Sequence, residues 1–497
     1  MRNQFILFLL CLFCIPTLQS QQTLTVAPVL SDGMVVQRNQ AISLWGTGTP
    51  NDTVFFKIKS HHKTIQVNPD GTWKTTLPKQ KIGLPFSIKI HTKKDRITIR
   101  DILAGEVWLA SGQSNMHLDL KRTIDGEAIA KKANNKNIRI FNMKPTYPTG
   151  ENGVHTLAEL TKIQNDHYFN TKGWVKASPE NVRYFSAVAY YFAEKLQKEL
   201  NIPIGIIHNA VPGSPIESWI SKKTITQDPA IQYFTKQRWL NKNNEDGMIS
   251  TAKNQISLSH TTKQKHPWMP TYNYVNGILP IKNMVIKGVI WYQGESNAAH
   301  PELYKNMLQK MVALWRTDFN QDFPFYSVQL TSRENRSTWP AFRNAQRELR
   351  DLVPNSKMVV ITDVGDKNDT HAKNKKPVGD RLAILALGDT YQLIDDYESP
   401  LFDKTSATKN GFQIHFKGSF NQLKTKGEKE IIGFEFSYDN LNFAKLQTEI
   451  QGKSIFFKNP IPKKKPIYIR YAWKAYTEAN VISTNNLPVS PFQTKIN

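Results

Sequence analysis

Ser114 lies in surroundings that could support covalent chemistry. It follows an apolar run at residues 107–110 and comes two residues after Gly112, where a short buried strand would turn sharply. A nucleophilic serine needs an exposed hydroxyl and a nearby backbone N–H to hold negative charge, and a strand-to-helix turn supplies both. The pattern is not the Gly-x-Ser-x-Gly elbow of α/β-hydrolases. Taken alone, such a pattern is a weak signal and more often marks only a capped turn, so other segments must decide.

The elements around Ser114 alternate between strands and helices. Further buried strands are expected at residues 204–207, 284–292 and 358–361, and helices at 185–200, 304–315 and 378–387. This alternation predicts a largely parallel sheet with helices on both faces. Ligands bind beyond the carboxyl ends of the strands in such sheets. The polar segments at 111–115 and 293–297 directly follow strands, and they are therefore expected at that edge.

The flanks of this α/β region have β character. Short alternating runs separated by turns predict an N-terminal β-sandwich module at 21–102, and similar runs predict a C-terminal β module at 399–497. The α/β domain between them spans 103–398, with a polar, partly helical insertion at about 227–270.

The first 20 residues have the layout of a cleavable export signal. Arg2 precedes an apolar run at 5–18, and Ser20 marks the expected cleavage site. The run is shorter than the roughly 20 residues of a spanning helix, although a retained anchor is the alternative. Cys11 and Cys14 both lie in this segment, so we expect a mature chain without disulfides or thiolate chemistry. A periplasmic or secreted protein without a membrane anchor is predicted.

The formal net charge of +24 raises the question of a nucleic-acid partner. The lysines are spread along the chain without a recognition motif, so nucleic-acid binding is not expected. The same positive charge would favour a weaker, less specific attraction to acidic glycans. Nothing in the sequence determines the oligomeric state.

Several segments together resemble the sialate O-acetylesterase branch of the SGNH-type hydrolases. The segments that carry the resemblance are Gly-Gln-Ser-Asn-Met at 112–116, Val-Pro-Gly-Ser-Pro-Ile-Glu-Ser-Trp at 211–219, Trp-Tyr-Gln-Gly-Glu-Ser-Asn at 291–297, the histidine block at 369–382, and β flanks at 30–38 and 487–492. The resemblance covers nearly the whole mature chain. It implies an SGNH-hydrolase (flavodoxin-like) three-layer α/β sandwich with a parallel sheet, flanked by the two β-sandwich modules.

The resemblance implies a catalytic role for two residues and leaves a third open. It assigns Ser114 as nucleophile and His371 as general base, a role that suits a histidine because its ordinary pKa lies near working pH. Many relatives carry an aspartate three residues before the histidine, where this chain has Asn368. Asp369 is then the candidate that orients the imidazole, with Asp366 or a Ser-His dyad as alternatives.

The same resemblance suggests the groups that stabilise the oxyanion. These are the backbone N–H groups of Ser114 and Gly213 and the side-chain amide of Gln293, with Asn297 in reserve. Glu295, Gln113 and Asn115 are expected to support the site or contact substrate. The chemistry requires no cofactor, and no metal site is expected.

The function that follows is removal of O-acetyl groups from glycans, foremost 9-O-acetylated sialic acids. Acetylated xylan or another plant glycan is the alternative substrate, because Ala372 and the Gly213-Ser214-Pro215 sequence depart from the family pattern and could reshape the pocket. A non-catalytic glycan-binding protein is the alternative of another class. A lipase or thioesterase would require an apolar acyl channel, and no run near the motifs suggests one.

Overall fold

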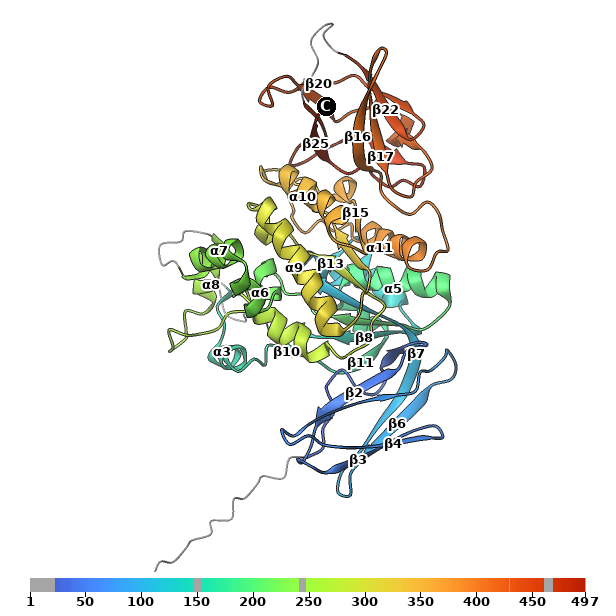
Figure 1. Ribbon diagram of the computed structural model, residues 1–497, viewed down its shortest axis with the longest axis vertical. Coiled ribbons are helices and arrows are strands. Elements are labelled where there is room, and N and C mark those ends of the chain that lie inside the picture. The colour runs from blue at the N-terminus through green and yellow to red at the C-terminus, as the bar shows by residue number, and fades with distance from the viewer. Residues whose placement is uncertain (1–22, 147–152, 241–246, 429, 460–467, 497) are drawn as a thin grey trace, which may run out of the picture.

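The computed structural model describes residues 23–146, 153–240, 247–428, 430–459 and 468–496. The molecule is elongated, with N-terminal strands at one end, C-terminal strands at the other and the helical region between them (Figure 1). Within the described ranges, no helix is long and apolar enough to cross a membrane. The predicted export signal and both cysteines lie outside these ranges, so export remains a prediction.

A seven-stranded mixed sheet forms the centre of the molecule. Its strand order is β11-β8-β12-β7-β13-β14-β15. Neighbouring strands run parallel from β8 to β15, and only β11 is antiparallel. The strands are β7 (Arg96–Gly112), β8 (Asn135–Asn142), β11 (Trp174–Ala177), β12 (Ile204–His208), β13 (Gly288–Tyr292), β14 (Phe325–Val328) and β15 (Ser356–Val359). The predicted central sheet with its helices is confirmed, and β11 makes the sheet mixed.

Helices cover both faces of this sheet because its inner strands are apolar on both sides. Trp108 and Ile290 share one core with α5 (Ala187–Leu200) and α11 (Lys376–Asp389). Leu109 and Val289, the alternate residues, belong to the core that contains α9 (Pro301–Phe319) and α10 (Trp339–Leu352). The alternation follows from the two-residue period of a strand.

Strand β7 joins the N-terminal strands to the central sheet without interruption. Its first half pairs with β6 (Phe86–His91), and its second half pairs with β12 and β13. The boundary predicted at residue 102 therefore falls inside a single strand of 17 residues. The remaining N-terminal strands are β1 (Val35–Gln37), β2 (Ile42–Thr47), β3 (Thr53–Ile58), β4 (His61–Gln66) and β5 (Thr72–Leu77).

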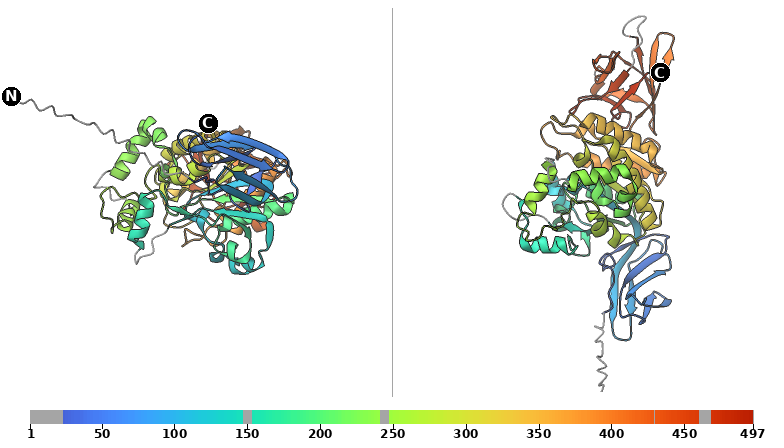
Figure 2. Two further views of the ribbon diagram at one scale, coloured as in Figure 1. Left: turned by 90° about the horizontal axis from the view of Figure 1, so that it is seen from below. Right: turned by 60° about the vertical axis from the view of Figure 1, so that its left-hand side comes forward.

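Helices α3 (Leu157–Gln164), α6 (Lys222–Gln227), α7 (Pro229–Leu240) and α8 (Gly247–Gln255) project to one side of the molecule (Figure 1, Figure 2). The remaining short helices are α1 (Ser114–His117), α2 (Gly126–Lys132) and α4 (Pro179–Arg183). Helices α7 and α8 lie in the polar stretch at about 227–270, where partly helical structure was expected.

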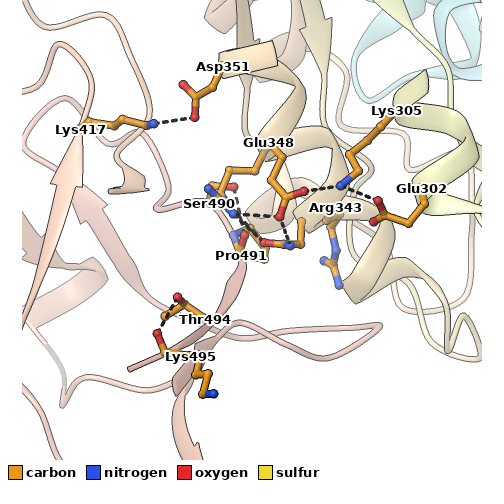
Figure 3. Close-up of polar contacts among 12 residues, drawn as sticks. Glu302, Lys305, Arg343, Glu348, Asp351, Lys417, Ser490, Pro491, Thr494 and Lys495 are labelled. Carbon is orange, nitrogen blue, oxygen red and sulfur yellow. Dashed lines mark hydrogen bonds and ion pairs between the residues drawn. The ribbon is translucent and has the colours of Figure 1, made fainter. Parts of the chain in front are cut away.

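The C-terminal chain forms separate β modules, as predicted, with strands β16 (Leu401–Thr408), β17 (Gly411–Lys417), β18 (Leu423–Thr425), β19 (Phe434–Ser437), β20 (Ala444–Lys445), β21 (Glu449–Gln451), β22 (Ser454–Lys458), β23 (Tyr468–Tyr471), β24 (Val481–Ser483) and β25 (Phe492–Lys495). Their seam with α10 is polar (Figure 3). Lys417 pairs with Asp351 over 2.5 Å. Buried Glu398 pairs with Arg350 and Lys357, each over 3.0 Å. Charge pairs thus fasten the C-terminal strands to the central domain.

Candidate active site

Ser114 and His371 line one cavity of about 440 Å³. Ser114 follows β7, and Asn142, at the end of β8, lies on the same wall. The end of β12 pairs with the ends of both strands, since His208 is opposite Ala110 and Asn142. The cavity therefore lies at the carboxyl edge of the sheet, where the sequence placed the site.

The turn before Ser114 is pressed against β13. Gly112 has a φ of +140°, and a Cβ there would lie 2.2 Å from the carbonyl oxygen of Tyr292. The N–H of Gln113 donates to that same carbonyl over 3.0 Å. Only glycine tolerates this backbone approach. The turn thus presents Ser114, which is half-buried, as the first residue of α1.

His371 belongs to a long loop that returns from the edge strand β15 to the centre of the sheet. The N–H of Ile124 donates to the carbonyl of Lys373 over 3.0 Å, and Asn115 Nδ2 donates to the carbonyl of Thr370 over 3.1 Å. The His371 side chain remains 40% exposed. Partial burial lowers the pKa of His371 below 6.5, and Lys375 lowers it further, while Asp369 raises it. The ring is accordingly a neutral base at pH 7.

Asp369 lies beside His371 in a geometry that is looser than a triad hydrogen bond. Its Oδ1 accepts a hydrogen bond from the backbone N–H of His371 over 2.8 Å and lies 3.9 Å from the ring Nδ1. A hydrogen bond between these groups would need about 3 Å. Asp366 instead accepts from the N–H groups of Asn368 and Asp369, so it shapes the loop. Asp369 can act on the ring through its charge.

A buried polar cluster ties the serine turn to the histidine loop. Asn115 Nδ2 donates to Glu295 Oε1 over 2.5 Å, and Lys375 Nζ donates to Asn115 Oδ1 over 2.6 Å. Asn115 and Lys375 are almost fully buried. Burial lowers the pKa of Lys375 to about 8 and raises the pKa of Glu295. Three chain segments that are distant in sequence are thereby held in one arrangement.

The groups predicted to stabilise the oxyanion have different surroundings in the structure. Gly213 adopts a φ of +73°, and a Cβ there would lie 2.3 Å from the ring of Trp268, so glycine is required. Gln293 is fully buried, and its Nε2 donates to Asn297 Oδ1 over 2.8 Å and to the carbonyl of Ser214 over 3.3 Å. The amide protons of Gln293 are therefore committed to protein acceptors and brace the segment after Gly213.

Asn297 and Gln113 also act as supports in this structure. Asn297 Oδ1 accepts from the N–H of Ile216, and its Nδ2 donates to Glu217 Oε2 over 3.0 Å. Glu217 is itself buried and pairs with Arg238 over 3.0 Å, which connects α7 to this network. Gln113 Oε1 accepts from the N–H groups of Gly294 and Ser296 over 3.3 and 3.4 Å. Neither amide lines the cavity.

Several cavity residues had no role assigned from the sequence. They are His117, Asp119, Arg122, Lys144 and Tyr184. His117, three residues after Ser114, could have been found from the spacing of one helical turn. The other residues lie in separate segments of the chain, and no sequence pattern connects them with Ser114. Among the described residues, no three His, Cys, Asp or Glu side chains are grouped to hold a metal ion.

Comparison with known proteins finds a matching family model and named relatives. The family described as "Carbohydrate esterase, sialic acid-specific acetylesterase" matches residues 104–238 and 228–387. Sialate O-acetylesterase of Mus musculus is 29% identical over 406 residues, covering 73% of each chain. The Homo sapiens enzyme is 27% identical over 423 residues, covering 76% of this chain and 73% of that protein.

A solved structure extends the likeness beyond the matched region. A carbohydrate acetylesterase from Xanthomonas citri superposes with a TM-score of 0.78 and 28% sequence identity, covering 95% of this chain and 99% of that one. The resemblance inferred from the sequence motifs is thereby confirmed. The chain belongs to the carbohydrate esterase family of sialic acid-specific acetylesterases, and it is a carboxylic ester hydrolase.

Proposed function

We propose that Ser114 and His371 remove O-acetyl groups from sugars, foremost 9-O-acetylated sialic acids, through an acetyl-enzyme. The observation that carries this proposal is that both side chains line one cavity although they are 257 positions apart in the sequence. The sialate O-acetylesterase relatives support the sialic acid substrate. The lowered pKa of His371 supports its role as base, because the ring is neutral at pH 7.

The reaction divides into two steps that share the same base. His371 takes the proton of Ser114 Oγ as that oxygen attacks the acetyl carbonyl carbon. The tetrahedral oxyanion then accepts hydrogen bonds from the backbone N–H groups of Ser114 and Gly213. Its collapse releases the sugar hydroxyl, which leaves with the proton held by His371. Water, deprotonated by His371, attacks the acetyl-enzyme, and acetate leaves as Ser114 Oγ regains a proton.

Asp369 acts in this scheme as an electrostatic partner of the imidazolium. The 3.9 Å between Asp369 Oδ1 and His371 Nδ1 favours stabilisation of the positive ring over a short hydrogen bond. Gln293 and Asn297 hold the Gly213 segment in position instead of donating to the oxyanion. Their direct hydrogen bonds to Ser214, Ile216 and Glu217 support this assignment.

Acetate release from 9-O-acetylated sialosides and from acetylated xylan tests the proposal. Wild type and Ser114→Ala are compared, with Ser178→Ala, a serine that does not line the cavity, as the matched control. Release from the sialoside is expected to fall at least about 10⁴-fold in Ser114→Ala and to persist in the control. Release from xylan alone would reassign the substrate. Activity retained by Ser114→Ala would overturn the mechanism.

A further inference from the structure

The cavity that holds Ser114 carries an excess of positive charge at its rim. Arg122 and Lys144 both line it and are exposed, whereas Ser114 is half-buried. In the described part of the chain, neither cationic side chain has a hydrogen-bond or ion-pair partner that the structure shows. Arg122 and Lys144 therefore keep their charges available to a ligand.

The remaining titratable groups of the cavity do not cancel this charge. Burial lowers the pKa of His117 to about 4, so its ring is neutral at pH 7. His371 is neutral for the same reason of burial. Asp119 supplies one carboxylate against two cations, and burial raises its pKa while Lys121, Lys144 and Arg122 counteract that rise. Arg122 and Lys144 line the same cavity, so the two cations face one space.

The two cations come from segments that the fold brings together. Arg122 ends η1 (Leu120–Arg122), a short helix close behind the serine turn. Lys144 begins β9 (Lys144–Pro145), which follows β8 on the other side of β12. Ser114 is half-buried, whereas Arg122 and Lys144 are exposed. Ser114 therefore lies deeper in the cavity, and the two cations lie nearer its mouth. A ligand that reaches Ser114 with one end would present its other end to Arg122 and Lys144.

We infer that Arg122 and Lys144 form a carboxylate-binding subsite that selects acetylated sugar acids over neutral acetylated sugars. The inference deepens the proposed function and rests on it. In a 9-O-acetylated sialic acid, the ester ends the glycerol side chain, and the carboxylate is on the ring carbon across the ring oxygen from the carbon that carries this chain, so several bonds separate the two groups. That separation matches a buried nucleophile with cations at the mouth. Arginine and lysine bind carboxylates through charge-assisted hydrogen bonds.

Two neighbouring groups complete the subsite. Tyr184 is 48% exposed and lines the cavity, and Lys121 Nζ lies 4.2 Å from the centre of its ring. This cation polarises an aromatic surface against which the sugar ring can pack. Asp119 offers carboxylate oxygens to sugar hydroxyls, which are hydrogen-bond donors. An anionic sugar thus finds a partner for its carboxylate, its hydroxyls and its apolar face.

The kinetic test compares Arg122→Gln and Lys144→Gln with Lys131→Gln, which removes a charge from an exposed position on α2 outside the cavity. The substrates are 9-O-acetylated N-acetylneuraminic acid, its C1 carboxamide and 4-nitrophenyl acetate. At pH 8, where His371 is neutral with or without Arg122, each cavity variant is expected to lower kcat/KM for the acid about 10-fold more than kcat/KM for the other two substrates, mainly through KM. Equal losses on acid and carboxamide, or no loss at all, would overturn the inference.

A binding test separates this inference from the proposed chemistry. In a Ser114→Ala background, the acetylated acid is expected to bind about 10-fold more tightly than its carboxamide, and the preference should disappear in Arg122→Gln. Added salt should weaken only the acid. If wild type releases no acetate but this preference persists, the mechanism fails and the subsite stands. If acetate is released but acid and carboxamide bind equally, the subsite fails and the esterase stands.

Discussion

Lys375 Nζ donates a hydrogen bond to Asn115 Oδ1 over 2.6 Å, and this contact fastens the loop of His371 to the turn of Ser114. Lys375 is four residues after the proposed base, and Asn115 is one residue after the proposed nucleophile. Both side chains are buried, so the ammonium depends on protein partners in place of water. The relative position of Ser114 and His371 is therefore fixed by a buried polar cluster that contains Asn115 and Lys375.

Lys375→Met should destabilise the protein by about 3 kcal/mol, because it leaves Asn115 and Glu295 buried without the cation. Lys376→Met is the matched control, since Lys376 forms an exposed pair with Asp380 over 2.6 Å. Loss of an exposed pair should cost at most about 1 kcal/mol. Urea unfolding measures both values. Equal stability of the two variants would show that the buried cluster does not stabilise the fold.

The rate of acetate release should rise with pH through a midpoint below 6.5, because the neutral form of His371 acts as base and its pKa is lowered. Asp369 raises that pKa, while Lys375, Arg122 and Arg333 lower it. Asp369→Asn should therefore move the midpoint to lower pH. The pH profile of kcat/KM measures this shift. A midpoint that moves upward, or stays fixed, would contradict the electrostatic role of Asp369.

The size of the rate loss in Asp369→Asn separates two mechanisms. A hydrogen-bonded triad aspartate can contribute about 10⁴-fold to kcat. The 3.9 Å separation in this structure predicts a smaller loss, about 10-fold at pH 8, because only charge stabilisation is removed. Single-turnover rates at saturating substrate give the value. A loss of three or more orders of magnitude would assign Asp369 to a full triad.

Gln293→Leu should reduce stability by about 2 kcal/mol and lower kcat by less than about 100-fold, because its amide braces Ser214 and Asn297. A direct oxyanion donor would instead cost about 10²–10³-fold in kcat. Gln329→Leu is a matched control, since Gln329 is also fully buried and donates to the carbonyl of Arg343. If Gln293→Leu and Gln329→Leu have similar free energies of unfolding but Gln293→Leu loses much more kcat, Gln293 would be assigned as a donor to the oxyanion.

Glu398→Gln should destabilise the seam with the C-terminal modules by about 3 kcal/mol, because it leaves Arg350 and Lys357 without their buried carboxylate. Burial raises the pKa of Glu398, but these two cations lower it below 4.5 overall. The stabilisation is thus present above pH 4.5 and lost as the pH falls through the folded-state pKa. The difference in the free energy of unfolding between wild type and Glu398→Gln should therefore become smaller at acidic pH. Lys417→Met, at the more exposed pair, should cost at most about 1 kcal/mol.

The sequence predicted the architecture where local patterns are strong. Helix periodicity indicated α5, α9 and α11 within a few residues, and the apolar run at 204–207 became β12. The prediction missed α10, although its apolar residues Trp339, Phe342 and Leu349 recur at helical spacing and form its buried face. The predicted domain boundary at residue 102 falls inside β7, because the sequence pattern changes after Asp101 while the strand continues from its pairing with β6 to its pairing with β13.

The sequence by itself predicted which residues could react, and the motifs around Ser114 and His371 indicated the family that the comparisons show. Only the tertiary structure decided which side chains face the cavity. It turned Gln293 and Asn297 inward as supports, and it brought Arg122 and Lys144 to the mouth of the cavity. The physical reason is that side-chain direction depends on hydrogen-bond partners supplied by segments far away in the chain, which no local spacing encodes.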